Sequence, residues 1–160
     1  MQALQAIELL AGYDPEGKPV VERLQVKVTP ADNCQLVRSP AFVRGLASGD
    51  IIKLQSDRQH FEIVQHSGNL AVCVYSRDDT VALSEALTPE LEKLGGQLDL
   101  ETDRMLVYSI HVSLGFKTIE DLLNKHVGAS SQSIWQYGNV YDPVDGQTPL
   151  NWWLDLLKPQ

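Results

Sequence analysis

Three residues in this sequence have side chains that together could hydrolyse an ester or an amide: Asp50, His66 and Ser67. In such an enzyme the histidine takes the serine proton while the aspartate orients the imidazole. Ser67 stands in the sequence HSGN, which lacks the GxSxG pattern that exposes a nucleophilic serine at a strand-to-helix corner. A hydrolase is therefore the weakest of the three function classes that the sequence leaves open, and we predict no catalytic residue.

The histidines and cysteines do not have the spacing of a metal site. The chain has four histidines and two cysteines, with no HExxH and no CxxC pattern. A zinc site made of His66, Cys73 and His111 would require three separate segments to converge. Asp99 and Glu101 alternate along an expected strand, which a solvated strand face explains better than a cation site. We predict no metal and no cofactor.

The segment GLASGDIIKL, residues 45–54, could be a phosphate-binding loop or a sharp corner. A phosphate loop leads from a strand into a helix whose first amides face the anion. The expected order is the reverse, a brief helix over residues 39–43 followed by a strand from residue 51. We therefore expect a corner, in which glycine supplies a positive φ and the Asp50 carboxylate accepts local backbone N–H groups.

Composition excludes several classes of partner. The formal net charge of −8, without a cluster of Lys and Arg, works against binding to nucleic acid or to an anionic membrane. The same charge favours a basic protein partner through electrostatic steering. Two cysteines without paired spacing, and the absence of a secretion signal at the N-terminus, indicate a cytoplasmic protein with reduced thiols.

Aromatic residues gather in the last third of the chain, and they are the candidates for a binding surface. Trp152 and Trp153 point about 100° apart on an expected terminal helix, so only Trp153 shares its apolar face. A partly exposed aromatic residue is typical of an interface anchor. We expect a partner to contact Trp152 and Tyr141 together with the acidic Asp99 and Glu101.

The hydrophobic pattern predicts the elements that position these residues. Alternation predicts strands, and a spacing of three to four residues predicts helices. The expected elements are a hairpin over 3–28, a strand at 34–37, the brief helix, a strand at 51–55, a hairpin over 61–75, helical sequence over 78–94, two strands within 97–112, a helix from 118, a strand at 133–141 and a helix from 148.

These elements predict an α+β protein. We expect a small N-terminal β-barrel or meander packed on a ferredoxin-like (split βαβ) C-terminal unit. Residues 1–160 should form a single compact domain, with a soft division into a β-rich half, 1–57, and an α+β half, 58–160.

The runs SPAFVRGLASGDIIKL and FEIVQHSGN, with a later Trp135-x-Tyr137 pair, resemble a bacterial family of uncharacterised proteins, domain of unknown function 4265. The matching positions are Pro40, Phe42, Gly49, Asp50, Ser67 and Gly68. Asn69 stands where the family often has a histidine, so no role of that histidine carries over. The resemblance implies a fold and a bacterial cytoplasmic setting, but it implies no activity.

The favoured interpretation is a non-enzymatic protein-binding module, inhibitor-like or immunity-like, with an acidic binding surface. The alternative is a regulatory domain that binds a small molecule in a groove between the two halves, beside Asp50, Ser67 and His66. The sequence is also compatible with a homo-oligomer.

Overall fold

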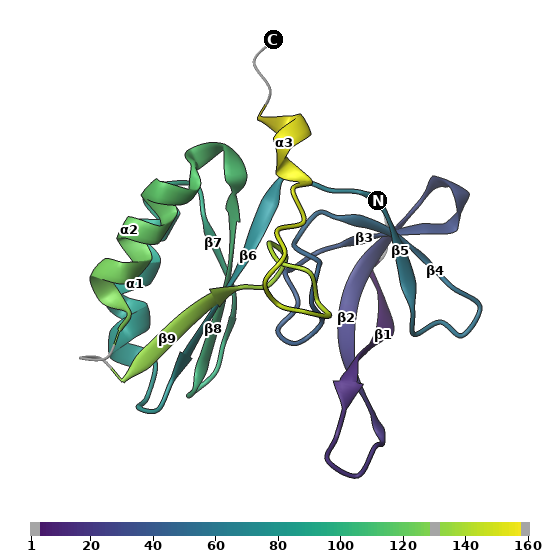
Figure 1. Ribbon diagram of the computed structural model, residues 1–160, viewed down its shortest axis with the longest axis horizontal. Helices are drawn as coiled ribbons and strands as arrows, with labels where there is room; N and C mark the ends of the chain where they lie inside the picture. Colours follow the sequence, from purple (N-terminus) through teal and green to yellow (C-terminus); the bar gives the residue numbers. More distant parts are fainter. Residues whose placement is uncertain (1–3, 129–131, 158–160) are drawn as a thin grey trace.

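The computed structural model describes residues 4–128 and 132–157. The chain forms two antiparallel sheets and three α-helices (Figure 1). The elements are β1 (Leu4–Tyr13), β2 (Pro19–Thr29), β3 (Asn33–Leu36), β4 (Ile51–Leu54), β5 (Phe61–Gln65), β6 (Asn69–Ser76), α1 (Val81–Lys93), β7 (Gln97–Glu101), β8 (Met105–His111), α2 (Phe116–His126), β9 (Ser133–Tyr137) and α3 (Trp153–Leu156), with short 3-10 turns at Pro30–Asp32 and Val112–Leu114.

The first sheet is a five-stranded meander in the order β1-β2-β3-β4-β5. Alternation along β2 buries Leu24 and Val26, as the sequence predicts. The Leu10 amide of β1 donates to the carbonyl of Gln59, in the turn between β4 and β5, at 3.0 Å. Among the residues described, however, no ladder joins β1 to β5, so the sheet is a meander and not a closed barrel.

The second sheet has the order β7-β8-β6-β9 and is covered on one face by α1 and α2 (Figure 1). Its strands β6 and β8 are central and almost fully buried. Apolar side chains from both strands and both helices form the larger core, which includes Leu70, Val72, Val74, Leu87, Leu91, Leu106, Tyr108, Ile110, Ile119 and Leu123. The continuous apolar sequence of β6 follows from this position, because both of its faces are covered.

The segment between β3 and β4 links the two sheets, and it is not helical. The expected helix over 39–43 is wrong. The Glu22 carboxylate accepts the backbone N–H groups of Ala41, Phe42 and Val43 at 2.7–2.9 Å, so these amides bind a side chain and not a helical carbonyl. Ala41 thereby packs onto the face of the second sheet opposite α1 and α2, beside Cys73.

The expected hairpin over residues 61–75 is also wrong. β5 pairs with β4 in the first sheet, whereas β6 pairs with β8 and β9 in the second. The turn at residues 66–68 therefore joins two sheets, and the five-stranded unit extends to Gln65. In contrast, the expected helical sequence over 78–94 forms the single helix α1, with Pro89 inside it.

Candidate functional site

The structure brings Asp50, His66 and Ser67 together at the junction of the two sheets. Asp50 is fully buried, and its carboxylate accepts the amides of Ser67 at 2.8 Å and Ala47 at 3.0 Å. His66 Nδ1 lies 3.8 Å from the same carboxylate. The Ser67 hydroxyl donates to the Ser48 carbonyl at 2.7 Å, so it is held by the backbone and not by the imidazole. This geometry ties two loops together.

The corner at residues 47–50 has the expected form. Gly49 adopts a φ of +86°, and an added Cβ would lie 2.8 Å from the Ser67 Cβ. The Asp50 carboxylate accepts a local amide, as predicted. The positive φ of Gly49, its close contact with Ser67 and the buried Asp50 carboxylate therefore explain the SGD sequence as a tight contact between two turns.

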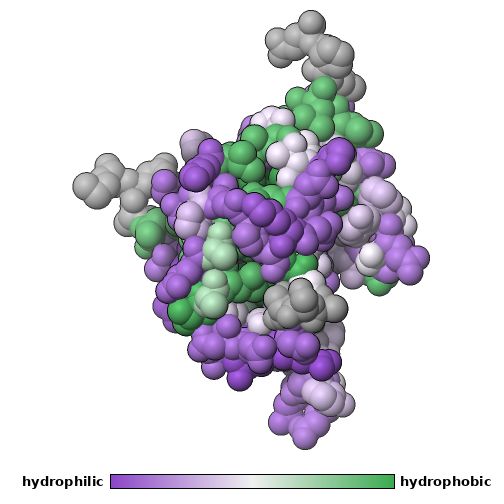
Figure 2. All heavy atoms as spheres, turned by 90° about the vertical axis from the view of Figure 1, so that its left-hand side faces the viewer, coloured by the Kyte–Doolittle hydropathy of each residue, from purple (hydrophilic) through white to green (hydrophobic). Residues whose placement is uncertain are grey.

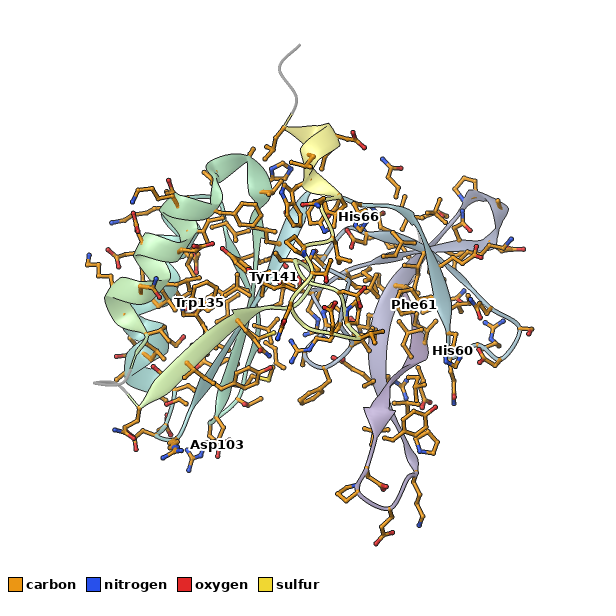
Figure 3. All side chains as sticks on the ribbon, in the orientation of Figure 1. His60, Phe61, His66, Asp103, Trp135 and Tyr141 are labelled. Carbon is orange, nitrogen blue, oxygen red and sulfur yellow. The ribbon has the colours of Figure 1, made fainter. Side chains whose placement is uncertain are left out.

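Trp152 fills the place where the sequence predicted a groove. Its ring stacks on His66 with centroids 4.7 Å apart, and its Nε1 donates to the Asn139 carbonyl at 2.8 Å. Figure 3 shows His66 between the first unit, which contains β1 to β5 (residues 4–65), and the second unit, which contains the four-stranded sheet and its helices (residues 69–157). Trp152 is only partly exposed, and Trp153 is buried as expected. The residues Asp50, Ser67 and His66 thus lie in a packed junction covered by Trp152.

Asp99 does not lie on an acidic surface, and the expectation that it points outward is wrong. It is 7 % exposed, and its carboxylate accepts the Ser39 amide at 2.8 Å and the Ser109 hydroxyl. The cause is a β-bulge between Leu98 and Leu100, which shifts the alternation of side chains along β7. Burial raises the pKa of Asp99, although these hydrogen bonds oppose the shift.

The acidic charge is nevertheless unevenly distributed. Residues 1–65 contain eight acidic and seven basic residues, whereas residues 66–160 contain thirteen and six. Exposed carboxylates cluster around α1 and the β7–β8 turn, at Asp78, Asp79, Glu85, Glu92, Glu101 and Asp103. The helix-covered side of the molecule is accordingly mainly hydrophilic (Figure 2). Within residues 4–128 and 132–157, no three His, Cys, Asp or Glu side chains form a metal-binding group.

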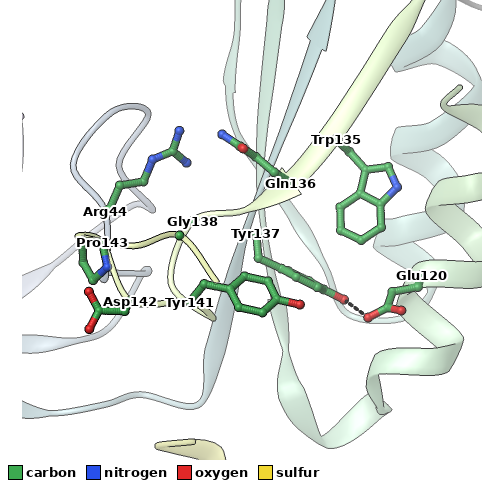
Figure 4. A pocket seen from close by; sticks show the side chains of 10 residues that line it. Arg44, Glu120, Trp135, Gln136, Tyr137, Gly138, Tyr141, Asp142 and Pro143 are labelled. Atoms are coloured by element: carbon green, nitrogen blue, oxygen red, sulfur yellow. Dashed lines mark hydrogen bonds between the residues drawn. The ribbon is translucent and has the colours of Figure 1, made fainter. Parts of the chain in front are cut away.

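A hollow of about 420 Å³ lies at the end of β9, next to Tyr141 (Figure 4). Tyr141 is 42 % exposed, and its role in a binding surface stays a prediction. The lining includes Trp135 and Tyr137, which contact α2, and Gln136, which points to the opposite face of the sheet. Because residues from both faces of the sheet line this hollow, it lies along the edge of β9. A second hollow of about 720 Å³ shares Trp135 and continues toward Ser133.

The hydrogen bonds of β9 show which backbone groups face outward. Among the residues that the structure describes, β9 is an edge strand that pairs with β6 alone. The bonds from Gly138 to Ala71 and from Arg77 to Gln132 place residues 134 and 136 in hydrogen-bonded pairs with β6. The N–H and C=O groups of Trp135 and Tyr137 therefore point away from the sheet, and within the described chain no hydrogen bond to them is present.

Arg44 is the basic side chain of the first hollow, and no local pattern in the sequence indicates its contact with Gln136. With the Gln136 amide oxygen turned toward it, that oxygen accepts from Nη1 at 3.0 Å and from Nη2 at 2.5 Å. The Tyr75 hydroxyl lies 3.4 Å from Nη2. The Gly45 amide donates to the Gly138 carbonyl at 2.8 Å, which fixes the loop of Arg44 against β9.

Comparisons with known proteins agree with the fold. A family model described as Domain of unknown function (DUF4265) matches residues 22–136. A solved structure, described as that of a hypothetical protein from Neisseria gonorrhoeae, has a TM-score of 0.65 and 18 % identity and covers 86 % of this chain and 94 % of its own. No curated protein matches. No helix in the described chain is long and apolar enough to cross a membrane. Since the family model spans most of the chain and includes the Pro40 to Gly68 landmarks, this protein belongs to the DUF4265 family.

Proposed function

We propose that this protein is a non-enzymatic protein-binding module that takes an extended segment of another protein onto the open edge of β9. The observation that carries this proposal is the outward direction of the N–H and C=O groups of Trp135 and Tyr137. An extended peptide that adds to a sheet edge gains main-chain hydrogen bonds from such groups. Pockets that receive alternate side chains then give specificity.

The sequence of β9 supports strand addition. Natural edge strands are protected against pairing by charged residues, prolines and bulges. β9, with the sequence SIWQY, has no charge and no proline, and its register with β6 is unbroken. Ile134 is 68 % exposed on this strand. The edge is thus competent to pair, and the two hollows lie along it.

The second unit has the element order β6-α1-β7-β8-α2-β9, which is that of a ferredoxin-like, split βαβ unit. We propose this assignment for the C-terminal half. In this arrangement the last strand lies at an edge, next to the first. The same topology that builds the core around β6 and β8 therefore leaves β9 accessible.

A different protein is a better occupant than a second copy of this chain. Residues 66–160 carry most of the net charge of −8, and pairing two copies through β9 would bring two acidic units together. An inhibitor-like or immunity-like role, in the bacterial cytoplasm, would use this edge to hold a partner. The acidic surface around α1 and the β7–β8 turn is a separate candidate site for a basic partner, which it would attract by steering.

The first hollow also supports the alternative, a small-molecule site. It is formed by Arg44 from the first unit and by Tyr137 and Tyr141 from the second. The groove beside Asp50 and Ser67 is a weaker candidate, because Trp152 stacks over His66 there. Enzymatic hydrolysis has the least support, since the Ser67 hydroxyl donates to a carbonyl and not to the imidazole.

The test is a selection of linear 12-residue peptides displayed on phage against the immobilised protein, followed by affinity and amide-exchange measurements on the synthesised peptides. In the free protein, the amides of Trp135 and Tyr137 should exchange faster than those of Ile134 and Gln136. A bound peptide should slow exchange at Trp135 and Tyr137 by at least about tenfold, because their N–H groups gain acceptors. Exchange that is unchanged at both residues would refute strand addition.

Two matched variants locate the binding. Ile134→Asp places a charge on β9, where we expect at least about tenfold weaker binding. Val64→Asp is the control, because Val64 is 52 % exposed on β5, an edge strand of the other sheet. Equal losses in both variants would contradict a site at β9. A dimer in solution that Ile134→Asp dissociates would instead identify a second copy as the occupant.

A further inference from the structure

The guanidinium group of Arg44 is held in place by uncharged side chains. Gln136 and Tyr75 provide the oxygen atoms that contact its guanidinium. A guanidinium has five N–H donors, so these contacts leave donors free. Tyr75 in turn donates to Gln136 at 3.1 Å, so the three side chains brace one another. The guanidinium is therefore preorganised at the edge of β9 before any ligand binds.

No carboxylate in the described part of the chain pairs with Arg44. The two carboxylates that line the same hollow have other donors: Glu120 accepts the Tyr137 hydroxyl at 3.0 Å, and Asp142 accepts the Val144 amide at 2.7 Å. Acidic residues outnumber basic ones by 21 to 13 in this protein, so carboxylates are plentiful. Arg44 is oriented but has no carboxylate partner, and it lies in a hollow beside an open strand edge. It therefore has the properties of an anion-recognition group.

We infer that the segment docked on β9 carries an aspartate or glutamate side chain that pairs with Arg44. This inference rests on the proposed function. Side chains directly opposite each other on paired strands share a face of the sheet. Gln136 and Arg44 lie on one face, so the acidic residue is the one that docks opposite Gln136. Arg44 and Gln136 would contact its carboxylate, and Figure 4 shows the Arg44 guanidinium facing Gln136.

The ligand is an acidic side chain within an extended peptide, and not a free carboxylate. A carboxylate on a docked strand is delivered to Arg44 at a fixed position by the main-chain bonds to Trp135 and Tyr137. A free carboxylate would have to bind through the guanidinium alone, in a protein whose net charge of −8 repels it. The strand therefore supplies the affinity, and Arg44 supplies the selection for a negative side chain.

The experiment uses the peptides selected on the wild-type protein. We expect Asp or Glu to be enriched at a single position, and replacement of that residue by Asn or Gln to weaken binding at least about tenfold. Arg44→Gln should weaken the acidic peptide by a similar factor and have little effect on its amide variant. Arg44→Lys should lose part of the affinity, because it keeps the charge but not the planar fork. Arg58→Gln, an arginine of the first unit, is the control.

The outcomes separate this inference from the proposed function. Peptides that protect the amides of Trp135 and Tyr137, yet bind Arg44→Gln as tightly as wild type, overturn the inference and leave strand addition standing. A selection that yields no peptide dependent on β9 overturns both. Acetate that shifts the Arg44 side-chain NMR signal and displaces no peptide would assign the hollow to free anions and also overturn the inference. Thermal unfolding of Arg44→Gln, which should match wild type, confirms that the variant folds.

Discussion

The two edges of the four-stranded sheet differ in how their strands meet the solvent. β7 has a bulge between Leu98 and Leu100, carries Glu101 and turns the Asp99 carboxylate into the protein. β9 has an unbroken register and no charged residue, and the N–H and C=O groups of its Trp135 and Tyr137 point outward. β7 thus has the features that protect natural edges against pairing, and β9 lacks them.

Charge in the sequence is therefore a poor guide to which edge of this sheet is open to pairing. Asp99 has the residue type of a surface contact, but it joins the two units through Ser39. Trp135 and Tyr137 have the residue types of a core, and their side chains do pack against α2. Their backbone, which no residue type reveals, is what faces outward. Which strand has an open edge is therefore a property of sheet order.

The largest effect expected from this comparison is the loss of the Asp99 carboxylate. Asp99→Ala leaves the buried Ser39 amide without an acceptor and removes a partner of Ser109, which should cost about 2 kcal/mol of unfolding free energy. Urea unfolding measures it. If Asp99 served only as a surface residue of β7, the variant would unfold like wild type, and that result would contradict its role between the units.

Asp99→Asn should instead remove a pH dependence. Because burial raises the pKa of Asp99, the folded protein holds this proton more tightly than the unfolded chain. The contribution of this carboxyl to stability is thus greatest below its unfolded pKa of about 4 and is lost as the pH rises through the folded pKa. Relative to wild type, Asp99→Asn should become more stable as the pH is raised from 3.5 to 7. A difference that is constant across this range would show that ionisation of Asp99 has no cost.

Local patterns in the sequence predicted the elements well, because their causes are local. The alternation that buries Leu24 and Val26, the helical spacing before Gly95 and the tight corner at Gly49 depend on neighbouring residues. The helix expected at 39–43 failed because its amides bind Glu22, a residue of another strand. Local propensity cannot anticipate such a competitor.

The sequence does not predict which distant strands pair with one another. β5 and β6 are joined by a short turn-like sequence, which favours a hairpin, yet they belong to different sheets. The same limit hid the candidate site. Arg44 and Gln136 meet beside the bond from Gly45 to Gly138, and nothing in the spacing of these residues indicates that contact. Tyr141 is a candidate on the sequence because aromatic residues gather in the last third of the chain, which is a local feature.

The smallest expected effect is that of removing the Glu101 charge from β7. Glu101 is exposed, and its carboxylate accepts the Ser84 hydroxyl at 2.9 Å. Glu101→Gln keeps an acceptor there, and Ser84 also contacts Thr88, so the unfolding free energy should change by no more than about 0.5 kcal/mol. Peptides selected on the protein should bind this variant within about twofold of wild type, because they dock at the opposite edge of the sheet. A tenfold loss in Glu101→Gln, with Ile134→Asp unaffected, would move the binding surface to β7 and its acidic neighbours.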